Sequence, residues 1–209
     1  MIGGGVLVLA VAIVVFIAKS KPSIIVDPVT VLKQSSVGIP KEEDRLAVQS
    51  ALIEFEKSGA LGPYFSGSYG CVVFPTIGKG GLGIGGAHGA GWVFKQGQLT
   101  GISKMTQLTI GFQAGGQAYS QIIFFENETA YTRFTGGNFE FGAQASAVAL
   151  TVGASAQAST AGGATAGAGS AQAKTAYTDG MAVFTLAKGG LMYEASLGGQ
   201  KYNYSPELK

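Results

Sequence analysis

The sequence of 209 residues has one cysteine, one histidine and few charged residues. Because Cys71 is the only cysteine, an intrachain disulfide and a cysteine-rich metal site are both excluded. Its apolar surroundings, YGCVVFP, favour an inert buried thiol. His88 is the only histidine, so a multi-histidine metal site is excluded and any histidine-dependent enzyme must use this residue.

Charged residues make up 12% of the chain, about half of the usual quarter, and the net charge is +2. Six of the fourteen basic and six of the twelve acidic residues precede Ser58. The rest of the chain carries no basic stripe, so the electrostatic footprint of a nucleic-acid binder is missing. Hydrophobic residues, at 46%, are abundant enough to argue against disorder.

A charge-free apolar run covers residues 2–18, IGGGVLVLAVAIVVFIA. As a helix it would be about 25 Å long, the short end of a membrane span. It is apolar on every side, which favours a hydrophobic signal or transmembrane helix over a buried core helix. No basic residue precedes the run and no A-x-A site ends it, so we favour an uncleaved anchor over a cleaved signal.

The charges after the run give one indication of the side of the membrane on which the domain lies. Lys19 and Lys21 follow the run, and the positive-inside rule would keep the domain cytoplasmic.

Residues 19–38, punctuated by Pro22 and Pro28, are predicted to be a linker with a short strand near 24–26. An amphipathic helix is expected over 41–59, because three acidic residues follow Pro40 and an apolar stripe follows them.

From Tyr69 onward the hydrophobic period changes from helical to two. Eight to ten short strands with tight turns predict a mainly β domain, an antiparallel barrel or sandwich, over residues 39–209. The expected strands include residues 106–113, 120–127, 129–134 and 138–150, with a closing hairpin over 180–197. Residues 154–173 hold no large apolar residue and are expected to form an Ala/Gly-rich loop.

Eight of the eighteen residues from Phe74 to Gly91 are glycine. A dinucleotide-binding G-x-G-x-x-G is met formally at residues 81–86, but the residues that follow do not have the pattern of a helix. Alternation with Leu82 and Ile84 instead predicts a strand with one bare face, which lets another chain segment approach closely. We therefore predict no cofactor or metal and assign a structural role to Gly81, Gly83, Gly85, Gly86, Gly89 and Gly91.

Four segments, in order, resemble the SYLF lipid-binding domain family, which includes yeast-type actin-binding members. The first is GCVVFPTIGKGGLGIGGAHGAGWVF, with the family's F-P, K-x-G and glycine run at Phe74, Pro75 and Lys79 onward. The others are TIGFQAGGQAYSQIIFF, FTGGNFEFGAQASAVA and VFTLAKGGLMYEASLGGQKY. Together the four segments cover about residues 39–204.

The resemblance implies a β-rich, non-enzymatic domain that binds membrane lipid. Eukaryotic members bind phosphoinositides or actin partly through N-terminal segments, which this chain replaces with the apolar run. Its architecture is similar to bacterial members that are exported or tethered to a membrane, so the resemblance implies a cell-envelope, periplasmic location.

Three functional hypotheses remain open at the level of sequence. The first is a membrane-tethered domain whose Lys79, Lys95 and Lys104 meet anionic headgroups. The second is a structural envelope protein that self-associates through its low-charge surface. The third is an enzyme dependent on His88, although no assembled catalytic motif surrounds that residue.

Overall fold

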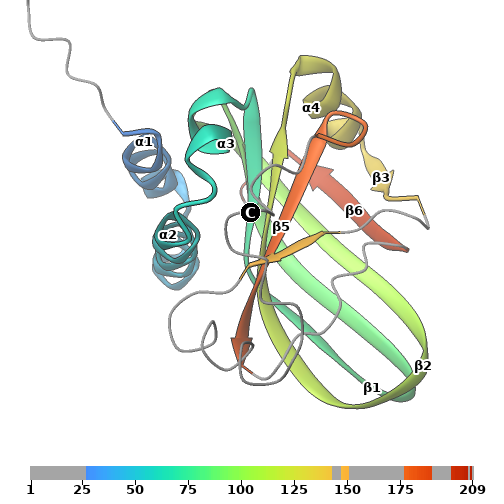
Figure 1. Cartoon of the computed structure of the whole chain (residues 1–209). Coiled ribbons are helices and arrows are strands. Elements are labelled where there is room, and N and C mark those ends of the chain that lie inside the picture. Colours follow the sequence, from blue (N-terminus) through green and yellow to red (C-terminus); the bar gives the residue numbers. More distant parts are fainter. Residues whose placement is uncertain (1–26, 143–146, 151–176, 190–198, 207, 209) are drawn as a thin grey trace, which may run out of the picture.

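The computed structural model describes residues 27–142, 147–150, 177–189, 199–206 and 208 (Figure 1). Along the chain, the first elements are helices and the later ones are mainly strands. The elements are α1 (Pro28–Ser35), η1 (Ser36–Gly38), α2 (Glu42–Lys57), α3 (Gly62–Gly67), β1 (Gly70–Lys95), β2 (Gln98–Phe125), α4 (Glu128–Thr135), β3 (Asn138–Glu140), β4 (Val148–Leu150), β5 (Met181–Gly189) and β6 (Gln200–Ser205).

Two very long strands, β1 of 26 residues and β2 of 28, form one antiparallel hairpin. The prediction of short strands is wrong here, because the glycines bend the strands without ending them. Bulges at three register shifts add to the bend. The hairpin turn places Gln96 at φ 48° and Gly97 at φ 78°, the two positive φ values that a type I′ turn requires.

Strand β2 is the centre of the described sheet. One edge pairs with β1, while the other is shared by β6 at residues 102–107 and β5 at residues 118–125. Strand β3 extends the sheet beyond β6, and β4 extends it beyond β5 as a parallel neighbour. The predicted mainly β class is confirmed, but the described strands form an open, mostly antiparallel sheet and not a closed barrel.

The hairpin curls so that the two halves of β1 approach each other, as Figure 1 shows at its lower right. Gln96 N donates to Tyr69 O at 2.9 Å, which joins the two ends of β1. At Gly91, an added Cβ would lie 2.6 Å from the ring of Phe74 in the other half of the strand. Only glycine allows this approach without displacing the ring.

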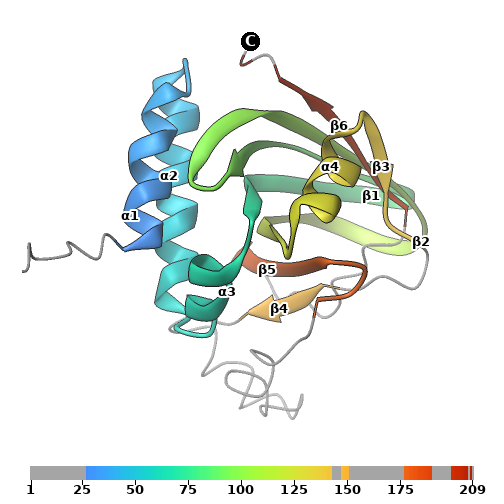
Figure 2. The same cartoon turned by 90° about the horizontal axis from the view of Figure 1, so that it is seen from above.

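Curling gives the sheet an outer and an inner face, each with its own core. The outer core packs the sheet against α1, α2 and α3, which stand along one side of it in Figures 1 and 2. Val48, Leu52 and Phe55 supply the apolar stripe of α2, so the expected amphipathic helix is confirmed. The inner core is enclosed by the curl and by α4.

Residues 28–38 are helical and not an extended linker. Asp27 caps α1 by accepting a hydrogen bond from Thr30 N at 2.9 Å, and Pro28 occupies the first turn. Val29 and Leu32, three positions apart, are buried in the outer core. This cap and this spacing place the segment in the folded domain.

Residues 129–134 form part of α4, so the strand predicted there is wrong. Asn127 accepts a hydrogen bond from Ala130 N at 3.0 Å and starts the helix. Ala130, Tyr131 and Phe134 then share one buried face at helical spacing. Packing of this face into the inner core outweighs the β-favouring aromatic and threonine residues.

Some sequence expectations concern residues outside those described, namely the apolar run at 2–18, the short strand at 24–26, the loop at 154–173 and the second strand of the closing hairpin at 190–197. The first strand of that hairpin is confirmed as β5. Among the described helices, none has the length and hydrophobicity to cross a bilayer.

Candidate functional site

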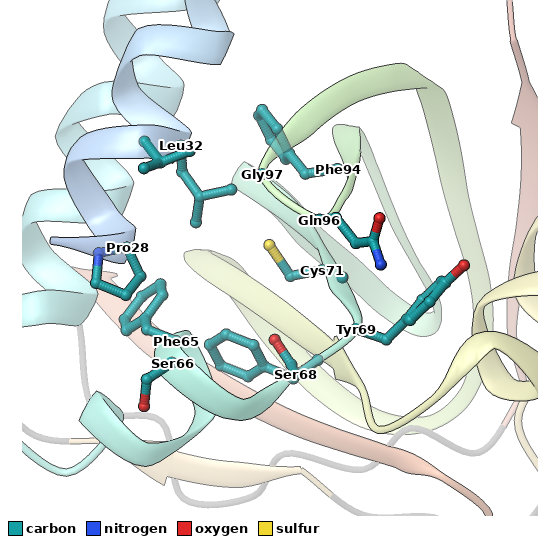
Figure 3. Close-up of a pocket in the computed structure, with 13 residues that line it drawn as sticks. Pro28, Leu32, Phe65, Ser66, Ser68, Tyr69, Cys71, Phe94, Gln96 and Gly97 are labelled. Carbon is teal, nitrogen blue, oxygen red and sulfur yellow. The ribbon is translucent and has the colours of Figure 1, made fainter. Parts of the chain in front are cut away.

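A pocket of about 360 Å³ lies between α1, α3 and the closed end of the β1–β2 hairpin. Figure 3 shows Pro28 and Leu32 from α1 on one side, Phe65 from α3 below, and Phe94 and Gly97 opposite. Its lining comes from distant parts of the chain and consists of Pro28, Val31, Leu32, Phe65, Ser66, Ser68, Tyr69, Gly70, Cys71, Phe94, Gln96, Gly97 and Phe124.

Two local arrangements hold the pocket walls in place. Ser35 Oγ donates to Gly97 O, which ties the end of α1 to the hairpin turn. On the other wall, Phe65 of α3 meets Phe124 of β2 edge-on, with ring centroids 5.1 Å apart. Because aromatic pairs of this geometry favour a fixed orientation, α3 keeps its place over the sheet.

The chemistry of the pocket is neutral and mostly apolar. None of its lining residues is Lys, Arg, His, Asp or Glu. Burial raises the pKa of the Cys71 thiol to about 12, so it stays protonated and unreactive at neutral pH. The prediction that Cys71 is buried is confirmed. The pocket suits binding of an apolar group and has no acid, base or activated nucleophile.

The three lysines singled out from the sequence occupy separate places. Lys79 lies in the first half of β1, opposite Gln117, and Lys104 lies in β2 between Ala90 and Asn203. Lys95 ends β1 beside α4.

Lys95 is part of a surface cluster with Tyr69, Glu128 and Tyr131. Its Nζ lies 3.4 Å from Glu128 Oε1 and 5.3 Å from the centroid of the Tyr69 ring. Tyr69 Oη donates to the same carboxylate at 2.8 Å, and this bond, with Lys95, lowers the pKa of Glu128. Hydrogen bonding to Tyr69 and Glu128 raises the pKa of Lys95. The charge of Lys95 is therefore already partnered.

Comparison with protein families identifies the C-terminal half of the chain. The family model described as "Ysc84: Las17-binding protein actin regulator" matches residues 106–206. These residues are similar to the Ysc84 (SYLF) family. The resemblance seen in the sequence is thus confirmed over residues 106–206. Among curated proteins, no significant match is found.

The region that the family model matches supplies a buried polar cluster inside the curl. Gln121 Nε2 donates to Tyr202 Oη at 2.6 Å, and Gln200 Nε2 donates to Tyr119 Oη at 3.3 Å. Burial raises the pKa of Tyr119 to about 12 and also holds the pKa of Tyr202 well above its usual value, so both hydroxyls stay neutral. Sequence reasoning missed this cluster, although glutamine and tyrosine at alternate positions of β2 were a visible signal.

The glycine stretch precedes the SYLF match and remains extended throughout β1, so no helix follows it. Besides the contact at Gly91, an added Cβ at Gly89 would lie 2.8 Å from Thr76 O, while at Gly86 the nearest contact, Gln107 O, is an ordinary 3.5 Å. Backbone pairing places Gly81 opposite Gly115 and Gly85 opposite Thr109, and Gly83 lies at a register shift.

A shallow hollow of about 570 Å³ lies where the halves of β1 meet, lined by Thr76, Gly78, Gly86, Ala87, His88, Gly89 and Ala90. His88 is exposed there and lies opposite Thr106 in β2. The lining has no carboxylate to orient the imidazole, and Thr76 Oγ1 accepts a hydrogen bond from Lys188 Nζ at 2.9 Å. Within the described residues, no three metal-ligating side chains cluster.

Proposed function

We propose that this protein is a non-enzymatic, membrane-tethered SYLF-family domain that binds membrane lipid in the cell envelope. The observation that carries the proposal is the charge-free run at 2–18, which precedes a folded domain of the SYLF family. The family description names protein binding and actin regulation and names no reaction, which supports a binding role over catalysis. The neutral pocket, without acid or base, supports the same choice.

The surface of the helix layer supports an orientation toward the bilayer. The N-terminal run precedes α1 in the sequence, and α1 stands beside α2 in Figures 1 and 2. Val37, Leu46 and Ile53 in this layer are 63%, 53% and 38% exposed. They are three of the four large apolar side chains exposed among the described residues. An apolar surface next to a tether fits contact with lipid.

The tether is tested with the full chain and liposome flotation. The double variant Leu9→Lys/Ile13→Lys puts two charges in the middle of the run, each costing about 2.5–3.5 kcal/mol in a membrane-spanning helix. We expect it to leave the floating fraction, while the matched variant Leu9→Ile/Ile13→Leu floats like the parent chain. If the lysine variant still floats after alkaline extraction, the run is not the tether.

Headgroup contact is tested in the chain that carries Leu9→Lys/Ile13→Lys, so that insertion of the apolar run does not mask binding through the lysines. Lys79 and Lys104 make no ion pair within the described residues, whereas Lys95 pairs with Glu128. Replacing Lys79 and Lys104 by Gln is expected to weaken binding to phosphatidylserine vesicles by about fivefold per lysine, at about 1 kcal/mol each. Lys57→Gln, which removes a lysine paired with Glu54, is the control. Equal binding to anionic and phosphatidylcholine vesicles would refute headgroup recognition.

A further inference from the structure

We propose that the pocket between α1, α3 and β1 takes one acyl chain of a membrane lipid. The proposal rests on the proposed function, because the tether is what brings the pocket to the bilayer. The pocket proposal goes beyond the proposed function by naming the part of the lipid that is bound and the place in the fold where that part binds.

The pocket grades from polar at its mouth to apolar at its base. Ser66 and Gln96 are exposed, and Ser68 is half-buried, whereas Cys71, Phe94 and Phe124 are buried. A lipid has the same order, from a polar ester region to a hydrocarbon chain. Its volume of about 360 Å³ falls within the range of roughly 300–1,000 Å³ that holds small ligands.

Charge distinguishes an acyl chain from a headgroup as the occupant. The lining has no lysine or arginine to neutralise a phosphate, and desolvating an unpaired anion against Phe94 and Phe124 would be costly. Lys95, which precedes the lining residue Gln96 in the chain, is engaged by Glu128. Hydrocarbon is the ligand chemistry that this lining accepts at no such cost.

The length of the chain ahead of the pocket places it near the bilayer. Pro28 lines the pocket, and nine residues, 19–27, separate it from the apolar run. Nine residues span at most about 30 Å when fully extended. A domain tethered by the run therefore keeps the pocket within about one bilayer thickness of the membrane surface.

The test is photo-crosslinking of the full chain in phosphatidylcholine nanodiscs. The probe is a phosphatidylcholine with a diazirine near the end of one acyl chain, and crosslinked peptides are identified by mass spectrometry. We expect crosslinks in the peptide that contains Cys71 and in that containing Phe94, besides those in residues 2–18. Crosslinks in residues 2–18 serve as an internal reference for insertion.

Ser68→Phe places a phenyl ring at the pocket wall and is expected to lower the Cys71 and Phe94 crosslinks about tenfold relative to the reference. Thr132→Phe, which adds the same ring at an exposed position of α4, should leave them unchanged. Ser68→Ala keeps the pocket open and should retain crosslinking, so filling of the pocket is distinguished from loss of the serine hydroxyl.

Two results would overturn the inference. Crosslinks in residues 2–18 without any at Cys71 or Phe94 would leave the tether intact and refute the acyl-chain pocket. Crosslinks that Ser68→Phe leaves at the parental level would do the same. A chain without crosslinks in either region would refute both the pocket and the proposed tether.

Discussion

Phe124 and Phe125 are adjacent in β2 but belong to two different cores. Phe124 points outward and contacts rings of α3 and β5, with Tyr64 at 5.5 Å and Phe184 at 6.0 Å. Phe125 points inward and meets Tyr131 and Phe134 of α4. One strand thus anchors helices from before and after the hairpin, on opposite faces.

The two cores differ in polarity as well as in composition. The buried cluster on the outer face is built from apolar and aromatic residues, while the inner face adds the cluster of Gln107, Tyr119, Gln121, Gln200 and Tyr202. Buried amides and hydroxyls need partners, whereas apolar side chains need only complementary shape. We therefore expect the outer face to tolerate apolar exchange better than the inner face tolerates loss of a hydrogen bond.

The largest expected effects come from truncating these two rings. Phe124→Ala and Phe125→Ala should each lower the free energy of unfolding by about 3–5 kcal/mol, because both rings are fully buried. Local effects should differ, with amide exchange accelerating first in α3 for Phe124→Ala and first in α4 for Phe125→Ala. Equal acceleration of both helices in both variants would show that the two cores unfold as one.

Close approach within the curl is tested at Gly91. Gly91→Ala would place a methyl group 2.6 Å from the Phe74 ring and is expected to cost about 1–3 kcal/mol in denaturant unfolding. Gly78→Ala, in the same strand but with no atom within 4 Å of the added carbon, should stay within about 0.5 kcal/mol of the parent protein. Similar losses at both positions would indicate that strand propensity, and not the approach of the two halves, sets the cost.

The N-terminal caps of α1 and α4 differ in charge, because Asp27 caps α1 and Asn127 caps α4. The stability that the cap gives to α1 is therefore expected to depend on pH. Asp27→Ala and Asn127→Ala should each cost about 1 kcal/mol at pH 7. The hydrogen bond from Thr30 N lowers the pKa of Asp27. A lowered pKa in the folded state means that this stabilisation is present above the unfolded pKa and is lost as pH falls through the folded value, below about pH 4.

Urea unfolding at neutral and acidic pH measures this contrast. The cost of Asp27→Ala should shrink in acid, whereas the cost of Asn127→Ala should be the same at both values. If the two costs change in parallel, protonation elsewhere dominates and Asp27 does not set the pH response of α1.

The smallest effect is expected for a buried hydroxyl without a partner. Thr185 is 1% exposed, and its Oγ1 has no hydrogen bond among the described residues. Thr185→Val should therefore be neutral or stabilising by up to about 1 kcal/mol. Ser120→Ala is the comparison, because Ser120 Oγ donates to Pro75 O at 2.8 Å and its loss should cost about 1 kcal/mol. A marked loss for Thr185→Val in thermal unfolding would contradict this reading.

Local periodicity was sufficient for the strongest elements of the fold. The apolar stripe with Val48 and Leu52 predicts α2, and the alternation in β1 predicts a strand where glycines could have indicated a phosphate loop. The four ordered segments also indicated the SYLF family, and the three that lie within residues 106–206 fall in the region that the family model matches. These signals lie within short windows of sequence, where spacing and structure are directly related.

What the sequence did not reveal depends on contacts between distant residues. Alternation in β2 separates Gln107 from Leu108, yet the structure buries Gln107 at 7% exposure and leaves Leu108 72% exposed. The partner of Lys95 lies 33 residues away, and the pocket combines residues from Pro28 to Phe124. Periodicity shows which residues share a face of a strand, but only the curl of the hairpin decides which of the two faces is enclosed.

The turn at Gln96 and Gly97 also bears on how the chain folds. It brings Lys95 next to Gln98, and each further pair of the hairpin adds to one already formed, out to Gly70 and Phe125. The cost of closing a loop is thus met once, at a two-residue connection, before β5 and β6 attach from remote parts of the sequence. The hairpin is accordingly the first part of the sheet that we expect to form, and both outer strands must wait for an edge that it creates.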